Sequence, residues 1–428
     1  MKRVLMLLTA VAATPAAAQT IAITNGRVAI GDGSAPIQSG TVLIRNGRIV
    51  AAGAGVAIPG DAQRIDAQGR WVTPGMVAGL TQLGLVEVGA VDTDNDIGAG
   101  KSPFSAAIDV TPAINSAASS FAITRARGVT RAFVAPAAST AIFAGQGALI
   151  ETSNDADVVT RPRAFQYVVF GEAGTSQAGG SRSATFAFFR NAMLEARNYA
   201  RNPSGFEGRT DESGLTRADA AALVPVLEGR MPLLVYVNRA AEIRQVLGLR
   251  KEFPKLDLVL VSATEGWVVA KDIAAAGVPV IAAALTDLPS AFESLGATQS
   301  NIGRMRAAGV KVGLAELGGQ PRNTKQSAGN LVALQKVPGA SGLSWDDALA
   351  AATSWPAEAM GMGSDFGSLR PGRRADVVIW DGDPLELSSA PTLMLIDGEQ
   401  QSLETRQTKL RDRYRNPQEG QLPKAYER

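Results

Sequence analysis

The chain has 428 residues, 46% of them hydrophobic and 19% charged, which is too apolar for a disordered chain and too long for one small domain. Its 42 Lys and Arg balance 40 Asp and Glu, and no long run of one sign occurs, so we expect no nucleic-acid partner. The chain contains no Cys and no His, which excludes disulfides, thiolate or imidazole metal ligands, and Ser-His or Cys-His catalysis.

The first 18 residues have the pattern of a secretory signal peptide. Lys2 and Arg3 precede the apolar stretch Val4 to Ala13, and small residues end at Ala18. The stretch is shorter than the roughly 20 apolar residues of a membrane-spanning helix, and no later segment reaches that length uninterrupted. We therefore expect cleavage after Ala18, export to a bacterial-type periplasm and no membrane span afterwards. The alternative is an uncleaved N-terminal anchor.

Residues 21–65 alternate short β-branched runs with turn pairs. Asn25-Gly26 and Asn46-Gly47 lie between such runs, and Asn-Gly between apolar runs is the strongest short hairpin signal. This pattern predicts a small antiparallel sheet. The same pattern returns in residues 375–380 and 392–396, so the two ends of the chain are expected to pair into one discontinuous domain.

The middle of the chain alternates apolar runs with helical segments. The runs are residues 129–135, 232–237, 256–261, 278–285 and 310–317, and the helical segments after the last four are residues 240–252, 266–276, 291–308 and 325–335. Continuously apolar strands alternating with helices are typical of a parallel sheet buried on both faces. The number of units favours a (β/α)₈ barrel, with an open doubly wound sheet as the alternative. No GxGxxG or Walker motif indicates nucleotide binding.

Motifs near both ends resemble those of a known family. They are Val72-Thr-Pro-Gly-Met-Val77 and the C-terminal segments 343–349, 351–361 and 367–376, the last of which ends in Arg373-Arg-Ala-Asp376. In these motifs the chain resembles the amidohydrolase superfamily, and within it the imidazolonepropionase-like group of exported proteins. The resemblance implies an α/β fold with a (β/α)₈ TIM-type barrel over residues 71–364. A small β-sandwich is implied from residues 19–70 and 365–405, followed by a C-terminal tail over residues 406–428.

Active members of this family bind one or two divalent metals, such as zinc, which activate a water molecule for attack on a carbonyl carbon. The resemblance places the following residues where the family has its ligands: Leu80 and Gln82 for the H-x-H pair, Glu172 at the fourth strand, Tyr236 and Asn238 around the fifth, Trp267 after the sixth, and Glu316 at the eighth. Because the chain has no His, the family's imidazole ligands are missing whatever the alignment. We therefore expect no metal cofactor.

The remaining candidates carry two interpretations each. Glu172 and Glu316 are weak catalytic candidates; with Glu265 they would offer oxygen ligands to Mg²⁺ or Ca²⁺, or else be solvated or paired with Arg. Tyr236 and Trp267 would stack on a flat ligand or fill the volume left by metals.

Other positions complete the expected pocket. Leu80 and Gln82 either pack or contact a ligand. The expected pocket consists of Gln82, Tyr236, Asn238, Glu265 and Trp267.

Two functions follow from these residues. The first is a non-catalytic relative that binds a small-molecule ligand or serves as partner subunit to an active amidohydrolase homologue or to itself. The second is an active hydrolase of carbon–nitrogen bonds in amides, dipeptides or cyclic imides. It would use a carboxylate metal site or a Glu base, and a lone base contributes only about 10²- to 10⁴-fold. Residue chemistry favours the first.

Overall fold

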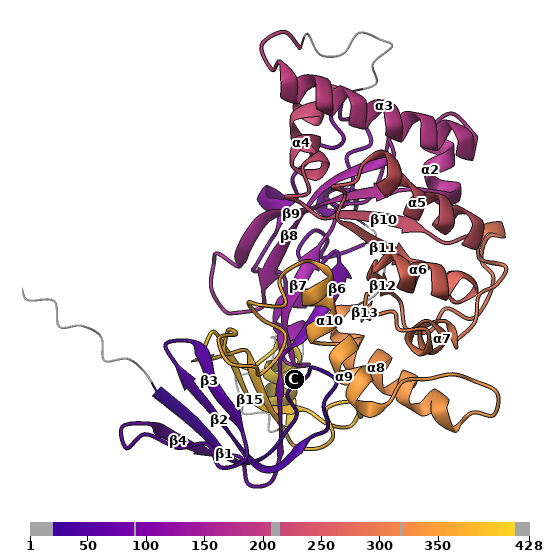
Figure 1. Cartoon of the computed structure of the whole chain (residues 1–428). Coiled ribbons are helices and arrows are strands. Elements are labelled where there is room, and N and C mark those ends of the chain that lie inside the picture. Colours follow the sequence, from indigo (N-terminus) through magenta and orange to yellow (C-terminus); the bar gives the residue numbers. More distant parts are fainter. Residues whose placement is uncertain (1–19, 90, 207–214, 317–319, 416–428) are drawn as a thin grey trace, which may run out of the picture.

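The computed structural model describes residues 20–89, 91–206, 215–316 and 320–415, and these form two sheets with helices around the second (Figure 1). The predicted signal peptide, residues 1–18, lies outside the described residues, as does the end of the predicted tail, residues 416–428. No helix in the described part of the chain has the length and apolarity needed to cross a membrane.

The first sheet combines strands from both ends of the chain. Its hydrogen-bonded order is β16 (Glu399–Gln400), β15 (Pro391–Ile396), β14 (Val377–Trp380), β5 (Trp71–Pro74), β1 (Thr20–Val28), β2 (Ile37–Arg45) and β3 (Arg48–Gly53), with β4 (Gln63–Asp66) beside β1. The hairpin between β2 and β3 turns at Asn46 and Gly47, both with positive φ, as the Asn-Gly pair predicts. However, β1 pairs in parallel with β4 and β5, so the sheet is mixed and not purely antiparallel.

The second sheet curls into a nearly closed barrel. Its strands follow one another in the order β13 (Val312–Leu314), β12 (Val280–Ala282), β11 (Leu258–Ser262), β10 (Leu233–Val237), β9 (Val159–Val169), β8 (Phe143–Glu151), β7 (Val129–Val134) and β6 (Met76–Thr81). The gap between the first and last strands is bridged where the N–H of Glu316 donates to the carbonyl of Leu80 at 3.1 Å. The predicted barrel with a second sheet from the chain ends is confirmed.

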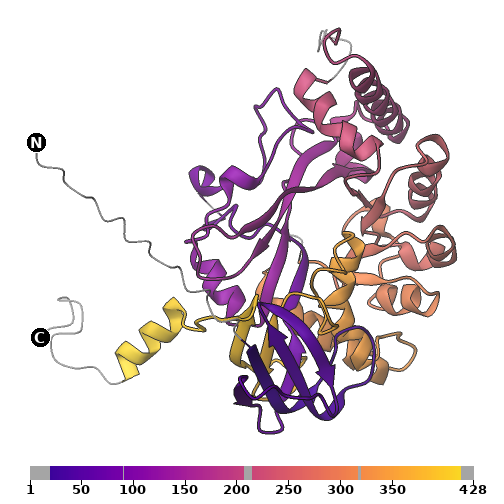
Figure 2. The ribbon, with the colours of Figure 1, turned by 60° about the vertical axis from the view of Figure 1, so that its left-hand side comes forward.

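Helices and short 3₁₀ turns cover the barrel. The α-helices are α1 (Ser119–Arg125), α2 (Gly171–Gln177), α3 (Arg182–Arg201), α4 (Arg217–Leu227), α5 (Ala240–Glu252), α6 (Ala270–Ala276), α7 (Asn301–Ala307), α8 (Thr324–Ala333), α9 (Trp345–Ala351), α10 (Ser354–Ala359) and α11 (Arg406–Arg415). The 3₁₀ turns are η1 (Asp92–Asp94), η2 (Thr111–Ala113), η3 (Gly266–Val269), η4 (Phe292–Ser294), η5 (Pro321–Asn323) and η6 (Leu334–Lys336). Helix α11 has no buried residue and projects from the body (Figure 2).

Two details of the barrel differ from the sequence-based expectation. Strand β8 runs antiparallel to β7 and β9, because no helix separates these three strands along the chain. The helix predicted over residues 291–308 is instead η4 followed by α7, and residues 295–300 between them form neither an α-helix nor a 3₁₀ turn. With this interruption, the buried side chain of Glu293 in η4 reaches the segment that follows β9.

Two glycines near the start of the barrel are required by close packing. A Cβ on Gly75 would lie 2.1 Å from Cγ2 of Thr130, and a Cβ on Gly128 would lie 2.1 Å from the ring of Trp380. Gly128 also has a φ of +91°, which L side chains rarely adopt. Trp380 is fully buried and donates its indole N–H to Thr73, so strands from the two ends of the chain meet at the start of the barrel.

A buried arginine joins the barrel to the first sheet. Arg131 of β7 donates to both carboxylate oxygens of Asp376 at 2.6 and 3.1 Å, and it pairs with Asp397 at 2.9 Å and Glu151 at 3.4 Å. We call these four residues the Arg131 cluster. The Arg131 side chain is 0% exposed, and its three partners raise its pKa against the effect of burial. The Arg-Arg-Ala-Asp motif therefore positions a carboxylate for a charge inside the barrel wall.

Candidate functional site

The carboxyl ends of the barrel strands surround an apolar centre. Leu80 is fully buried and belongs to one core cluster with Val169, Val261 and Ala315, which come from the ends of β9, β11 and β13. Gln82, two residues after Leu80, is half-buried. The position that the resemblance assigns to the first histidine of the H-x-H pair is thus packed among aliphatic groups.

Polar groups gather at one side of this mouth, beyond the ends of β9 and β10. Arg182, at the start of α3, lies 3.4 Å from Glu242 of α5, 3.7 Å from Glu293 of η4 and 4.0 Å from Glu172 of α2. We call these four residues the Arg182 cluster. The side chains of Glu242 and Glu293 are only 2% and 6% exposed, whereas those of Arg182 and Glu172 are 34% and 40% exposed. One partly open cation therefore faces three carboxylates, two of them buried.

The main chain after β9 holds the two buried carboxylates. The N–H of Gly171 donates to Oε1 of Glu242 at 3.0 Å, and the N–H of Glu172 donates to Oε2 of Glu293 at 2.6 Å. Gly171 has a φ of +73°, and the two successive N–H groups at this turn each hold a different carboxylate. A Cβ at Gly171 would lie 2.3 Å from Oε2 of Glu293, so a larger residue would displace this carboxylate as well as adopt a strained backbone conformation. Burial raises the pKa of Glu242, and the Gly171 N–H and Arg182 oppose that shift.

Asn238 connects this cluster to the next strand. Its amide nitrogen donates to Glu293 at 3.0 Å and to the hydroxyl of Tyr236 at 3.1 Å. Its amide oxygen accepts from the N–H and the hydroxyl of Thr264. Tyr236 and Asn238 therefore lie together beside Glu293, and both ends of the Asn238 amide are already in use.

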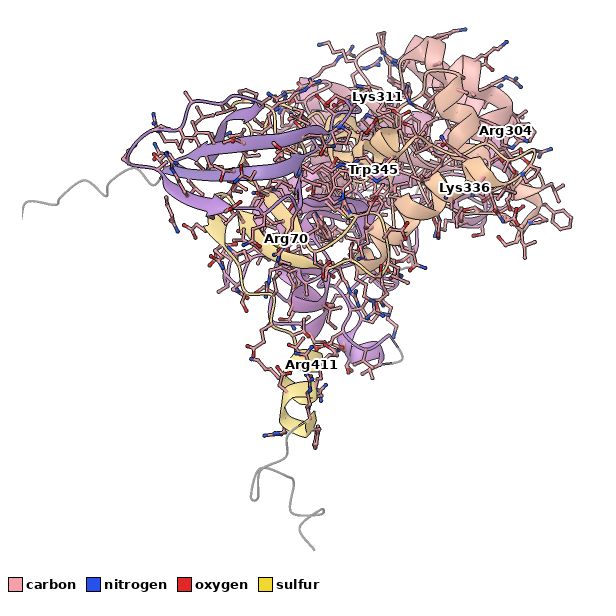
Figure 3. The ribbon with its side chains drawn as sticks, turned by 90° about the horizontal axis from the view of Figure 1, so that it is seen from below. Arg70, Arg304, Lys311, Lys336, Trp345 and Arg411 are labelled. Atoms are coloured by element: carbon pink, nitrogen blue, oxygen red, sulfur yellow. The ribbon has the colours of Figure 1, made fainter. Side chains whose placement is uncertain are left out.

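Glu265 and Trp267 form hydrogen bonds with the main chain of the loops around the mouth. Glu265 accepts from the N–H groups of Ala240 and Gly296, each at 2.9 Å. The indole N–H of Trp267 donates to the carbonyl of Gly296 at 2.8 Å, and the guanidinium of Arg304, labelled in Figure 3, lies 4.5 Å from the centre of the Trp267 ring. These two residues hold the segment before α7 against the end of β11.

Glu316 lies apart from the Arg182 cluster, just after β13. Its carboxylate accepts from the hydroxyl of Ser327 at 2.8 Å, and burial raises its pKa. The three carboxylates proposed as oxygen ligands thus have separate partners: Glu172 pairs with Arg182, Glu265 binds two main-chain N–H groups, and Glu316 binds Ser327.

These donors do not fit the divalent metal of the family. A metal ligand needs a free lone pair directed at a common point, but Leu80 has none and the Asn238 oxygen already accepts two hydrogen bonds. The carboxylates that do converge have a guanidinium among them. Within the described residues, no set of three His, Cys, Asp or Glu side chains is arranged to hold a metal ion.

The sequence reasoning missed Arg182, Glu242 and Glu293. Arg182 follows Gly179-Gly180-Ser181, and the hydroxyl of Ser181 caps the N-terminus of α3. A serine after two glycines is a signal for a helix start, so the sequence did indicate a helix that begins at Arg182. Glu242 lies in the first turn of the helix predicted after residue 237. Glu293 had no such signal, because its position depends on where the predicted helix is interrupted.

Comparison with known proteins agrees with this architecture. Residues 256–408 match the sequence profile described as "Amidohydrolase family". Over 57 residues the chain is 46% identical to the amidohydrolase tasK of Hapsidospora irregularis, a match that spans 13% of this chain and 6% of that relative.

Solved structures are similar along most of the chain. An amidohydrolase from Thermotoga maritima MSB8 superposes with a TM-score of 0.77 at 24% identity, covering 89% of this chain and 99% of that one. Phenylurea hydrolase B gives a TM-score of 0.53 at 17% identity over 89% of this chain and 96% of its own. The C-terminal part of the chain thus matches the amidohydrolase family, and the fold as a whole is similar to that of solved amidohydrolases.

Proposed function

We propose that this protein is a non-catalytic member of the superfamily, whose barrel mouth binds a ligand or a partner subunit instead of hydrolysing an amide. The observation that carries the proposal is the Arg182 cluster. Its guanidinium supplies positive charge to three carboxylates beside the ends of β9 and β10. A guanidinium balances negative charge, but it offers no open coordination position and does not deprotonate a water molecule as a metal does.

The groups around the cluster support the same proposal. A hydrolytic site needs a nucleophile and a base within hydrogen-bond reach of the reacting carbon. Here Glu242 and Glu293 accept main-chain N–H groups, Asn238 is fully engaged, and aliphatic side chains fill the centre of the mouth. These contacts order a polar surface, and they leave little of it free for proton transfer.

Metal uptake tests this proposal directly. Total divalent metal per chain would be measured by elemental analysis on untagged protein after dialysis, together with hydrolysis of amide, dipeptide and cyclic-imide substrates with added Zn²⁺ or Mn²⁺. We expect metal far below one equivalent and no hydrolysis above the uncatalysed rate. Bound metal near one equivalent with turnover would overturn the proposal.

A matched pair of variants separates charge balance from a general surface effect. Arg182→Ala removes the cation from the cluster, and Arg190→Ala removes an exposed cation two turns later on α3 that pairs with Glu252. If the guanidinium takes the place of a metal, Mn²⁺ binds more tightly to Arg182→Ala than to the wild type, and Arg190→Ala behaves like the wild type. Equal Mn²⁺ affinity in all three proteins would argue against charge replacement.

The second candidate function is an active hydrolase with Glu316 as general base. It is favoured by the burial of Glu316, which raises its pKa, and by its position at the end of β13. Under this alternative, Glu316→Gln would abolish a measurable turnover. A lone base supports only about 10²- to 10⁴-fold acceleration, so the assay must detect slow turnover.

For the partner role, we propose a second amidohydrolase-fold chain, either an active homologue or another copy, that covers the segment 285–295. Leu288, Phe292 and Leu295 are 78%, 84% and 65% exposed, and Glu293 of the Arg182 cluster lies among them. Light scattering would give the mass of the chain alone and with an active homologue. We expect a mass above that of the monomer in one of these two samples. Phe292→Ser should reduce this mass. Leu387→Ser, which changes an exposed apolar residue elsewhere (59% exposed), should not.

We also propose that the protein is exported, like the imidazolonepropionase-like group that its terminal motifs resemble. The support is the N-terminal pattern of Lys2 and Arg3, an apolar stretch and small residues up to Ala18. N-terminal sequencing of protein from a periplasmic fraction should begin at Gln19. Recovery of protein starting at Met1 in the cytoplasm would contradict export.

A further inference from the structure

A cavity formed by other parts of the chain than the Arg182 cluster lies between the barrel wall and the C-terminal segment. It has a volume of about 760 Å³ and is lined by residues from the end of α1, from η5 and α8, from the loop before β15, and from the start of α11. This volume falls within the range of small-molecule sites. Figure 3 labels Arg411, which contributes to the cavity from α11.

The charged groups that line this cavity are all positive. Arg127, Arg322, Lys325 and Arg411 line it, and no Asp or Glu of the described residues does. Arg127 and Arg322 form no ion pair within the described part of the chain, while Arg411 pairs only with its exposed neighbour Asp412. Several cations that share one concave surface without a carboxylate between them repel each other, and a bound anion would relieve that repulsion.

One of these charges, that of Lys325, is buried and held in place by the main chain. Lys325 is 1% exposed, and its ammonium donates to the carbonyls of Glu386, Leu387 and Ser389. Burial lowers its pKa to about 8, the positive charge of Arg127 adds to this shift, and Asp381 opposes it. Because its donors are used by the main chain, Lys325 contributes charge to the cavity, and the free hydrogen-bond donors come from the arginines.

We propose that this cavity binds a small phosphorylated molecule, with its phosphate at the guanidinium groups of Arg127 and Arg322 and its organic part against Leu387 and Leu403. Arginine presents a planar fork that matches phosphate oxygens, and two such groups suit a dianion better than a monoanion. The aliphatic part of the lining gives an organic group a surface that inorganic phosphate would leave uncovered. This site is separate from the proposed function of the barrel mouth.

Isothermal titration of the full chain with three probes tests the ligand chemistry. Inorganic phosphate, phenyl phosphate and benzoate would be compared at one pH and one salt concentration. We expect phenyl phosphate to bind more tightly than inorganic phosphate, and benzoate to bind weakest. Equal affinity for benzoate and phenyl phosphate would overturn the preference for phosphate. Equal affinity for the two phosphates would assign the site to inorganic phosphate and overturn the organic part of the proposal.

Variants place the binding in this cavity. Arg127→Gln combined with Arg322→Gln should weaken phenyl phosphate binding by about tenfold or more. Arg201→Gln, an exposed change at the end of α3, should leave it unaltered. Both arginines are exposed, so the double variant is expected to keep its fold, which circular dichroism would verify. Unchanged binding in the double variant overturns the proposal, as does an oligonucleotide that competes far better than phenyl phosphate, since that would indicate a nucleic-acid surface.

Discussion

Two arginines in this chain each face three carboxylates, yet their surroundings differ. Arg131 is 0% exposed and contacts its partners at 2.6 to 3.4 Å, whereas Arg182 is 34% exposed and its contacts are 3.4 to 4.0 Å long. Asp376 takes two hydrogen bonds from Arg131, the geometry of a tight fork. The same residue types thus form a structural joint in one place and an open, looser site in the other.

The largest effect is expected at the buried arginine. Arg131→Leu leaves Asp376 and Glu151 without their cation, and removing one partner of a buried pair costs about 3–5 kcal/mol. Guanidinium chloride unfolding would measure the loss of stability. Arg131→Lys keeps the positive charge but not the two-pronged hydrogen bonding, so its stability should lie between that of Arg131→Leu and that of the wild type. A loss below about 1 kcal/mol for Arg131→Leu, typical of a surface pair, would remove the distinction between the clusters.

A change in the main chain of the Arg182 cluster should have the next largest effect. Gly171→Ala forces an L residue into a left-handed conformation and pushes its Cβ against Glu293, so we expect a loss of about 1–3 kcal/mol. Gly277→Ala is the matched control, because Gly277 has a φ of +62° and open space around its Cβ. Thermal unfolding would compare the two. Equal losses would mean that the contact with Glu293 contributes nothing beyond the backbone conformation.

Replacing the open arginine should cost less. Arg182→Leu removes charged contacts that are long and partly solvated, and we expect a loss of about 1–2 kcal/mol in urea unfolding. The ratio of this loss to the loss in Arg131→Leu measures how much less the Arg182 cluster contributes to stability than the Arg131 cluster. A loss as large as at Arg131 would identify the Arg182 cluster as a second structural joint.

The smallest effect is a dependence on pH. Burial raises the folded-state pKa of Glu242 above its unfolded value of about 4.3, so the folded protein binds more protons in the interval between the two pKa values. Stability from this group is complete below the unfolded pKa and is lost as pH rises through the folded pKa. Glu242→Gln should therefore flatten the fall of stability above pH of about 4.3. Parallel curves for the variant and the wild type would contradict the raised pKa.

Local signals predicted much of the fold, and long-range geometry limited the rest. Asn46-Gly47 specified its hairpin, and the motif around Pro74-Gly75 led to a close approach that only glycine permits. Strand β8 was not among the predicted apolar runs, because Gly145 and Gly147 interrupt its apolar residues, and its antiparallel pairing with β7 and β9 was missed with it.

The candidate site was predicted less completely for the same reason. Tyr236 and Asn238 were assigned to the pocket through the family resemblance, and they lie in and directly after a recognisable strand, β10. Arg182, Glu242 and Glu293 come from α3, α5 and η4, and only the folded barrel brings them together. Hydrophobic periodicity says which elements form, but it does not say which charges converge on one point.

The pairing of β5 with β14 has a consequence for how the chain reaches its native state. Trp71 lies opposite Trp380, so β5 stays unpaired on this side until β14, more than 300 residues further along the chain, has been synthesised. Contacts of such large sequence separation slow folding, and until then β5 presents unpaired N–H and C=O groups to other nascent chains. During biogenesis this edge is where a holdase chaperone would protect the protein best, and a slow supply of the last 50 or so residues would expose it longest.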